Sequence, residues 1–280
     1  MMKIVFNLRE LRRERSALSG TLGLVPTMGC LHIGHLSLVQ AAREQNDYVA
    51  VSVYVNPLQF GMGEDLDDYP RDPDGDLEKL ESEGVDLVWM PEKTEIYPDG
   101  YQTYVTVEQL SSRLEGERRP GHMRGVTTVV TKLLIAFTPD RVYLGEKDAQ
   151  QIHVIQRLVA DLQFAVEVVV CPTVRDLDGL ALSSRNAKLN PDQRNAATVL
   201  YRALTAARSA FMDGERSGSR LRAVMTEIVA AEPLAEPLYV SVADIETLQE
   251  LKRLPEKSLC SLAVRIGKVA LIDNVVLEIT

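Results

Sequence analysis

Short, continuously apolar runs alternate with segments of helical spacing, and this alternation limits the fold more than any other feature of the chain. The runs are residues 22–25, 48–55, 85–90, 142–144 and 166–170. They lack a strict apolar–polar alternation, as expected of strands that are buried on both faces. Helical spacing occupies the intervals, in residues 36–45, 77–83, 126–137 and 149–162. The pattern predicts an α/β fold, with a Rossmann-like parallel sheet that carries helices on both faces.

A different pattern follows in the last third of the chain. Residues 191–213 and 217–230 predict two helices, and Pro191 directly after Asn190 suits the first position of a capped helix. Strand-like runs then occur at 238–242, 259–266 and 269–272, the last two separated by a Gly-Lys pair that suits a two-residue hairpin turn. We therefore expect two domains, residues 1–176 and a smaller α+β domain at 177–280.

The net charge of −9 is concentrated in one segment. Residues 64–99 hold fourteen acidic and three basic residues, which leaves the rest of the chain at +2. We expect this acidic stretch to be a solvated face. Because the chain has no basic face, neither nucleic acid nor an anionic membrane is an expected partner.

The compartment is expected to be the cytoplasm. No apolar run reaches the ~18 residues of a membrane span, and residues 1–15 lack the apolar core of a signal peptide. The three cysteines, Cys30, Cys171 and Cys260, are widely spaced, which is typical neither of a disulfide framework nor of a cysteine metal site.

Residues 26–35, PTMGCLHIGH, follow the first apolar run and precede a helix. Glycines there permit close backbone approach, and the following helix N-terminus can bind an anion. His32 and His35 are three residues apart, so both can donate to a phosphate as charge develops during transfer. Two ordinary turn histidines, or a zinc site lacking a nearby third ligand, are the alternatives. The position at the first strand–helix crossover favours a phosphate site.

Three further polar segments are candidate sites: residues 56–60 (NPLQF), 145–151 (GEKDAQQ) and 182–186 (LSSRN). The glutamine of the first can present both a donor and an acceptor to a small polar ligand. Lys147 suits a phosphate and Asp148 a ribose hydroxyl, while two serines followed by Arg185 can hold a polyphosphate. Taken alone, each segment is more often a solvated turn or linker.

Together these segments resemble a known family. The His-x-Gly-His spacing resembles that of nucleotidylyl transferases and class I aminoacyl-tRNA synthetases, and the string PTMGCLHIGHLSLV (26–39) resembles the pantothenate synthetase (pantoate–β-alanine ligase) family. The other blocks that agree in order and spacing are YVNPLQF (54–60), DYPR (68–71), LEGERRPGH (114–122), GVTTVVTKLL (125–134), LGEKDAQQ (144–151), PTVRDLDGLALSSRN (172–186) and LIDN (271–274).

The resemblance implies ATP-dependent condensation of (R)-pantoate with β-alanine to pantothenate, through a pantoyl adenylate and with release of pyrophosphate and AMP. It also implies a sheet of nucleotidylyl transferase type, a C-terminal domain that closes over the ATP site, a homodimer, and Mg²⁺ held mainly by the ATP phosphates. Asp72, Asp74 and Asp76 are less favoured as metal ligands, and no residue is assigned to a metal.

By resemblance, catalysis is assigned to His32, His35 and Lys147. Gln59 and Gln151 are expected to bind pantoate, and Gln59 also β-alanine. The residues expected to bind ATP are Met28, Gly29, Cys30, Leu31, His32, Ile33, Gly34, His35, Gly145, Glu146, Lys147, Asp148, Val174, Leu182, Ser183, Ser184 and Arg185.

Two alternatives remain beside the ligase. Another His-x-Gly-His nucleotidylyl transferase would lack YVNPLQF and DGLALSSRN, and a non-catalytic nucleotide-binding module is expected to have lost His32, His35 or Lys147. All of these are present, which favours the ligase. Arg118, Arg119 and His122 form a basic segment that either faces an anionic substrate or lies flexible on the surface.

Overall fold

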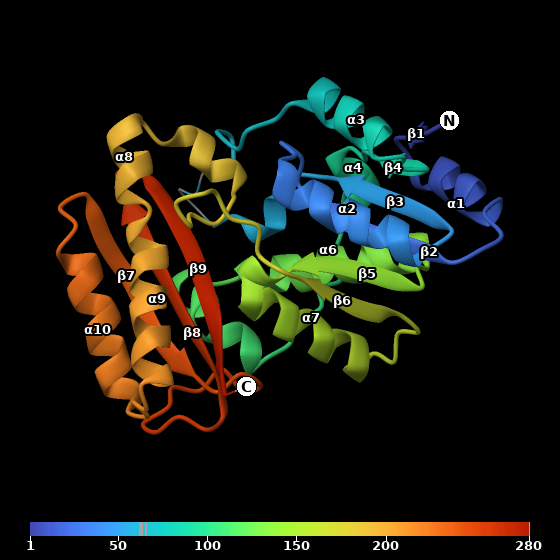
Figure 1. The fold of residues 1–280 in the computed structure, drawn as a ribbon. Coiled ribbons are helices and arrows are strands. Elements are labelled where there is room, and N and C mark those ends of the chain that lie inside the picture. The colour runs from blue at the N-terminus through green and yellow to red at the C-terminus, as the bar shows by residue number, and fades with distance from the viewer. Residues whose placement is uncertain (62–63, 65, 280) are drawn as a thin grey trace. The chain divides into compact units, whose positions relative to one another are not determined.

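The computed structural model describes residues 1–61, 64 and 66–279, so Asp65 of the acidic stretch lies outside the described residues. The chain forms two compact units, shown in Figure 1. Unit 1 comprises Met1–Glu146 and Gln150–Pro172, and unit 2 comprises Lys147–Ala149 and the chain from Thr173 onward. The division of function between the two expected domains stays a prediction.

Unit 1 is built on a six-stranded sheet with the order β1-β4-β3-β2-β5-β6, in which every pairing is parallel. The strands are β1 (Lys3–Val5), β2 (Leu22–Thr27), β3 (Tyr48–Val53), β4 (Leu87–Trp89), β5 (Arg141–Gly145) and β6 (Glu167–Cys171). The helices in this part of the chain are α1 (Leu8–Ser16), α2 (Ile33–Gln45), α3 (Pro73–Ser82), α4 (Lys93–Ile96), α5 (Glu115–Arg118), α6 (His122–Phe137) and α7 (Ala149–Asp161), with 3₁₀ turns η1 (Pro57–Gln59), η2 (Leu110–Ser112) and η3 (Glu146–Asp148).

Alternate residues of the strands of unit 1 face two separate cores. Leu24 of β2 and Trp89 of β4 belong to the α6-side core, which also contains residues of α1 and α7. Val25 and Val88 belong to the α2-side core, together with residues of α2 and α3. Because strand side chains alternate with a period of two, helices cover both faces of the sheet. The expected Rossmann-like parallel sheet with helices on both faces is confirmed.

The strand order of the sheet reverses between β2 and β5. After β2 the chain adds β3 and β4 on one side, and β5 and β6 then lie on the other side of β2. Gly23 and Leu24 of β2 pair with Arg141 and Val142 of β5. The carboxyl ends of these neighbouring strands lead directly into residues 27–35 and 145–148. In open α/β sheets, ligands bind outside the strand ends at such a reversal point.

Unit 2 contains an antiparallel sheet of β7 (Ala235–Ala243), β8 (Lys257–Ile266) and β9 (Val269–Glu278), in that order. The α9 (Val199–Met212) and α10 (Gly218–Ala230) helices pack against it, with α8 (Pro191–Ala196) and the 3₁₀ turn η4 (Ser184–Lys188) preceding them. Ile266 pairs with Val269 across the two-residue turn that the sequence predicts. The expected small α+β fold is confirmed.

Several elements differ from the sequence prediction. The strand β1 and the helix α1 were not expected, because Leu8 and Leu11 are the apolar contacts of a helix that is otherwise rich in Arg and Glu. The helix expected at 191–213 is divided into α8 and α9, where Thr198 N–H bonds to Asn195 at a tighter, 3₁₀ spacing. The last strand continues six residues beyond the expected end, to Glu278.

Candidate active site

The loop that follows β2 turns sharply before α2 begins. The Thr27 hydroxyl donates to the carbonyl of Ser52 (2.9 Å) and accepts from the N–H of Gly29 (3.3 Å). Gly29 (φ 81°) and Cys30 (φ 51°) both adopt the left-handed backbone conformation, which is unfavourable for a residue with a side chain. The loop therefore combines a tight turn with backbone strain at Cys30.

His32 and His35 each have one ring nitrogen held by the main chain. The N–H of Gly34 donates to Nδ1 of His32 (3.1 Å), and the N–H of His32 donates to Nδ1 of His35 (3.3 Å). Because a backbone N–H can only donate, each neutral ring carries its proton on Nε2. The two ring centroids are 4.1 Å apart. The N-terminus of α2 thus carries two adjacent imidazole N–H donors, beside an Ile33 side chain that is 68% exposed.

Among its described residues, the acidic stretch contains one buried carboxylate, and for this residue the expected solvated face is wrong. Asp76 of α3 is 1% exposed, and its oxygens accept from the N–H groups of Cys30 (2.8 Å) and Leu31 (2.6 Å). Asp72 instead caps α3 through Gly75 N–H. Among the described residues, no group of three or more His, Cys, Asp and Glu side chains is arranged to hold a metal ion.

The side-chain amide of Gln59 is oriented by Asn56. Nδ2 of Asn56 donates to Oε1 of Gln59 (3.0 Å) and to the carbonyl of Gly125 (3.1 Å). Oδ1 of Asn56 accepts from the N–H of Leu58 (3.3 Å) and from the hydroxyl of Tyr97 (2.9 Å). A backbone carbonyl only accepts and a backbone N–H only donates, so these contacts fix the orientation of both amides. Gln59 is 8% exposed, and its NH₂ end points away from Asn56.

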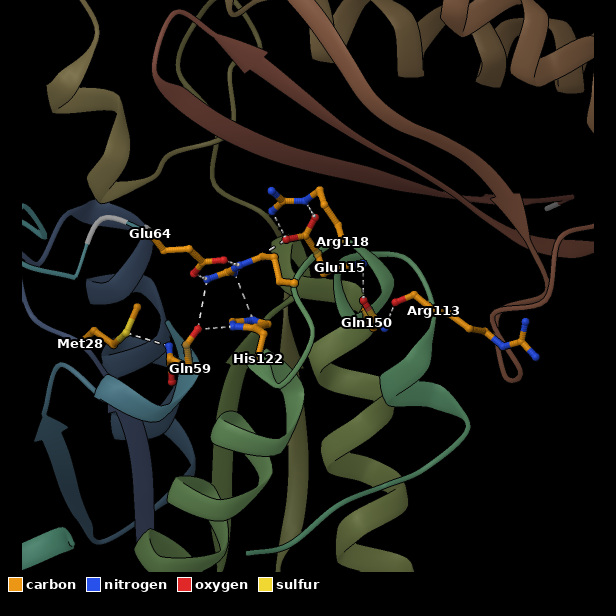
Figure 2. Close-up of polar contacts among 9 residues, drawn as sticks. Met28, Gln59, Glu64, Arg113, Glu115, Arg118, His122 and Gln150 are labelled. Carbon is orange, nitrogen blue, oxygen red and sulfur yellow. Dashed lines mark hydrogen bonds and ion pairs between the residues drawn. The ribbon is translucent and has the colours of Figure 1, made fainter. Parts of the chain in front are cut away.

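That NH₂ end lies beside the β2 loop. Nε2 of Gln59 is 2.8 Å from the sulfur of Met28, a contact visible in Figure 2. The structure thus brings together one residue expected to bind ATP and the residue expected to bind pantoate and β-alanine. Because sulfur is a weak acceptor, this contact leaves the Gln59 NH₂ group able to donate more strongly to an oxygen ligand.

The main-chain carbonyl of Gln59 accepts from two side chains of the 115–122 segment. It lies 2.7 Å from Nδ1 of His122, a contact drawn in Figure 2. It also lies 3.1 Å from a guanidinium nitrogen of Arg119. Arg119 also pairs with Glu64 (2.7 Å from Nε), and its side chain is only 11% exposed. Arg119 is therefore not a loose surface side chain, because it pairs with Glu64 and holds the Gln59 backbone. Whether the segment also faces an anionic substrate stays a prediction.

His122 is a neutral donor in this arrangement. Its Nδ1 must carry the proton that bonds to the Gln59 carbonyl, which leaves Nε2, 3.3 Å from Arg119, as an acceptor. Burial and the neighbouring positive charge of Arg119 lower the pKa of His122 from 6.5 to about 4. The imidazole therefore stays uncharged at neutral pH.

The adjacent Gln150 and Gln151 differ sharply in their surroundings. Gln150 is buried, accepts from the N–H of Glu115 (3.0 Å) and donates to the carbonyl of Arg113, as Figure 2 shows. It also donates to the carbonyl of Leu110. Gln151 is half-buried, and its amide has no hydrogen bond within the described ranges. Of this pair, only Gln151 has its polar groups available to a ligand.

In unit 2, residues 174–186 form a closed loop. The N–H of Leu182 bonds to the carbonyl of Val174 (3.0 Å), and the Ser183 hydroxyl caps η4 through the N–H of Arg185. Arg175 anchors the loop to β9 by two bonds to the carboxylate of Asp273 (2.6 and 2.8 Å), which is almost fully buried. The expected ATP-binding residues from Val174 to Arg185 thus share one segment closed by hydrogen bonds, and Ser184 within it is buried.

The neighbouring residue of β9 holds Lys147. Asn274 donates from Nδ2 to the carbonyl of Lys147 (2.9 Å), so two consecutive residues of β9 support the Lys147 turn and the 174–186 loop. The ammonium of Lys147 makes no ion pair in the part of the chain that the structure describes. Glu146 and Asp148 flank it in η3, directly after Gly145 ends β5.

Sequence reasoning missed the residues that hold the site in shape. Asp76, Tyr97 and Asp273 lie 45, 41 and 98 positions from the groups they contact. Only Asp273 has a signal in the sequence, because the Asp-Asn pair interrupts the apolar β9 run.

A parallel sheet whose order reverses beside a His-x-Gly-His helix N-terminus defines a nucleotidylyl transferase-type protein. The chain belongs to the pantoate-beta-alanine ligase family, whose model matches residues 1–276. The expected class, a ligase that forms an amide bond, is thereby confirmed.

No helix among the described residues has the length and apolar character that crossing a membrane requires.

Three relatives illustrate the likeness. The pantothenate synthetase of Roseiflexus sp. (strain RS-1) is 56% identical over 277 residues, covering 99% of this chain and all of the relative. The crystal structure of pantothenate synthetase from Thermus thermophilus is 46% identical with a TM-score of 0.95, covering 99% of this chain and 100% of that one. The pantoate-beta-alanine ligase of Francisella tularensis, crystallised with Beta-gamma ATP and beta-alanine, is 35% identical with a TM-score of 0.81, covering 100% of this chain and 99% of that one.

Proposed function

We propose that this chain condenses (R)-pantoate with β-alanine at the expense of ATP, through a pantoyl adenylate. The observation that carries the proposal is the pair of imidazole N–H donors at the N-terminus of α2, where the strand order of the parallel sheet reverses. Family membership supports the choice of substrates.

The chemistry needs activation because a carboxylate does not react with an amine at neutral pH. A pantoate carboxylate oxygen attacks the α-phosphorus of ATP, and the bond from that phosphorus to the bridging oxygen breaks, which releases pyrophosphate. The β-alanine nitrogen then attacks the acyl carbon and loses a proton. The bond between the acyl carbon and the oxygen that bridges to phosphorus breaks, and AMP leaves with that oxygen. Neither step requires a covalent enzyme intermediate, so positioning and electrostatics suffice.

Each expected residue has a role in this scheme. His32 and His35 donate to the α-phosphate oxygens, while Lys147 and the 183–185 segment neutralise the polyphosphate. The remaining backbone of residues 28–35 and 145–148 contacts ATP, with Val174 and Leu182 on the adenine side. Gln59 donates to pantoate and β-alanine, and Gln151 to pantoate. The Gln59 NH₂ group, bonded among the described residues only to the weak acceptor sulfur of Met28, supports its role. The Gln151 amide and the Lys147 ammonium, which have no hydrogen bond or ion pair within the described ranges, support theirs.

Further properties belong to the same proposal. Mg²⁺ is held mainly by the ATP phosphates, since Asp76 is already bonded to two backbone N–H groups and Asp72 caps a helix. The protein acts in the cytoplasm as a homodimer, and its C-terminal domain closes over ATP, as the resemblance implies.

The direct test is product analysis by mass spectrometry, with the protein mixed with ATP, Mg²⁺ and pantoate, with and without β-alanine. Pantoyl adenylate without the amine, and pantothenate plus AMP with it, are expected. A product in which the adenylyl group is transferred to a phosphate ester, or no turnover of pantoate, would refute the proposal.

The role of Lys147 has its own test in Lys147→Ala, compared with Lys268→Ala in the exposed hairpin turn of unit 2. Loss of a charge-assisted phosphate contact should weaken ATP binding or the transition state by about 1.5–3 kcal/mol. Lys268→Ala should match the wild type. If Lys147→Ala binds ATP and forms adenylate normally, the site assignment is wrong.

A further inference from the structure

We propose that Asp76 is a positioning residue, which holds the loop after β2 in the conformation that presents His32 and His35. The inference rests on the proposed function, because it takes this loop to be the nucleotide-binding loop. Asp76 lies on α3, far from the loop in sequence, and no motif of the sequence marks it.

The two oxygens of the Asp76 carboxylate bind consecutive amides of the loop. Oδ2 accepts from the N–H of Cys30 (2.8 Å), and Oδ1 accepts from the N–H of Leu31 (2.6 Å). Hydrogen bonds to an ionised acceptor are shorter and stronger than neutral ones. Two such bonds from one rigid carboxylate fix the orientation of both peptide planes, so the residue that follows, His32, starts α2 at a defined place.

The backbone conformation at this point requires such support. Gly29 and Cys30 have φ angles of 81° and 51°, so a residue with a side chain is held in the left-handed region. Such conformations persist only where the surrounding structure determines them, and they gather at functional sites. A Cβ added to Gly29 would lie 3.0 Å from Oδ2 of Asp76 and 3.1 Å from Val53 Cγ1, which shows how closely the carboxylate and the loop approach.

Stability alone does not explain a carboxylate at this place. Asp76 is 1% exposed, and Nζ of Lys79 is 3.9 Å away, beyond hydrogen-bond distance. Burial raises the pKa of Asp76, while the N–H groups of Leu31 and Cys30 lower it. Burying a charge costs free energy that its hydrogen bonds only partly return. The carboxylate is therefore best explained by the geometry that it imposes on the loop.

The variant that tests this is Asp76→Asn, which keeps the size of the side chain but directs an NH₂ group at one of the two N–H donors. Asp74→Asn is the matched control, because Asp74 is an exposed residue in the same first turn of α3 and undergoes the same change in charge. For Asp76→Asn we expect kcat to fall by about 10²-fold, since misplaced catalytic groups cost rates of this order. The KM for ATP should rise about tenfold, while the KM values for pantoate and β-alanine stay within about twofold.

This division of effects separates positioning from simple destabilisation. A merely structural role would lower the concentration of folded enzyme and leave every KM unchanged. Asp74→Asn should match the wild type in all four constants. If Asp76→Asn leaves both kcat and the ATP KM unchanged, or raises the three KM values alike, the proposal is overturned.

Amide hydrogen exchange, followed by NMR, needs neither activity nor a stable variant. In the wild-type protein the Cys30 and Leu31 amides should exchange at least about tenfold more slowly than the amides of exposed loops. In Asp76→Asn their protection should fall, while that of the sheet amides persists. Unprotected Cys30 and Leu31 amides in the wild type would refute the proposal even if the variant fails to fold.

The two proposals fail in different ways. If wild-type protein forms no pantothenate, the proposed function is wrong, whatever the exchange data show. If wild-type protein forms pantothenate and Asp76→Asn does so equally well, the function stands and the positioning role of Asp76 is rejected.

Discussion

The rings of His32 and His35 lie with their centroids 4.1 Å apart, each tied at Nδ1 by a main-chain N–H, so that both present Nε2–H. This arrangement assigns the two histidines as donors rather than as bases. A donor aimed at the α-phosphate acts mainly on the transition state, because charge builds on the phosphate oxygens only as the carboxylate attacks.

For this reason, His35→Ala and His32→Ala should each lower the rate of adenylate formation by roughly 10²–10³. ATP affinity should fall less, and so should the rate at which β-alanine attacks preformed adenylate. Single-turnover kinetics measures these quantities, and circular dichroism verifies folding. His153→Ala, on α7, is the control and should adenylate pantoate normally. If both site variants form adenylate at the wild-type rate, His32 and His35 have only a structural role.

Gln59→Ala should weaken pantoate binding by about tenfold or more, because truncation leaves ligand oxygens without their donor in a buried place. ATP affinity should change little, since the amide contacts the nucleotide loop only through Met28 sulfur. Titration calorimetry with each ligand measures the difference, and Gln102→Ala, at an exposed position, is the control. A selective loss of ATP affinity would contradict the role assigned to Gln59.

Gly125→Ala should disturb the Gln59 turn from the side of α6. A Cβ at this position would lie 2.3 Å from the carbonyl oxygen of Leu58 and 2.6 Å from the nitrogen of Gln59, so the turn would have to move. Overpacking of this kind costs about 1–3 kcal/mol, which urea denaturation would detect. The KM for pantoate should also rise. If neither the stability nor the KM for pantoate changes, η1 moves aside without effect on the Gln59 site, and the prediction is wrong.

The low pKa of His122 predicts a pH dependence of stability. Between its ordinary value of 6.5 and its value of about 4 in the folded protein, the unfolded chain binds a proton that the folded protein does not. Acidification through this interval therefore favours unfolding. His122→Gln keeps a donor for the Gln59 carbonyl but cannot titrate. We expect its urea midpoint to fall less than that of the wild type between pH 6.5 and 4, and parallel pH profiles would contradict the assignment.

The cysteines should be dispensable for catalysis. Burial is the main cause of a raised pKa for Cys30, Cys171 and Cys260, the last to about 12, so none carries an activated thiolate. Cys30→Ala should retain adenylation activity within about threefold, since its side chain lends no group to the chemistry. The measurement is pyrophosphate release under saturating ATP and pantoate. Complete inactivation with an intact fold would indicate a thiol mechanism.

The sheet could be predicted because burial on both faces leaves a visible mark. In a continuous apolar run such as 22–25, alternate residues enter two different cores, so residues of both faces must be apolar. The β2 loop could also be located, since its glycines and histidines follow one of those runs directly. Both signals are local in sequence, and local patterns of residues indicate the secondary structure of the segment that contains them.

The remaining parts of the site depend on contacts distant in sequence. Asp273 and Asn274 look like turn residues, yet they continue β9 because Arg175 and the carbonyl of Lys147 satisfy their polar groups. Gln150 and Gln151 are chemically identical neighbours, and only the position of the 110–115 segment makes one structural and leaves the other available. Asp76 looks like any other residue of an acidic helix until its partners are known.

The presence of two separate cores, one on each face of the sheet, bears on how such an enzyme can change over evolutionary time. Asp76, α2 and the nucleotide loop depend on packing on one face, whereas Leu58 and α6, which support Gln59, depend on packing on the other. Substitutions that share no partner across the sheet act nearly independently. Selection for a different acid or amine can therefore remodel the α6 side while the handling of ATP is inherited intact.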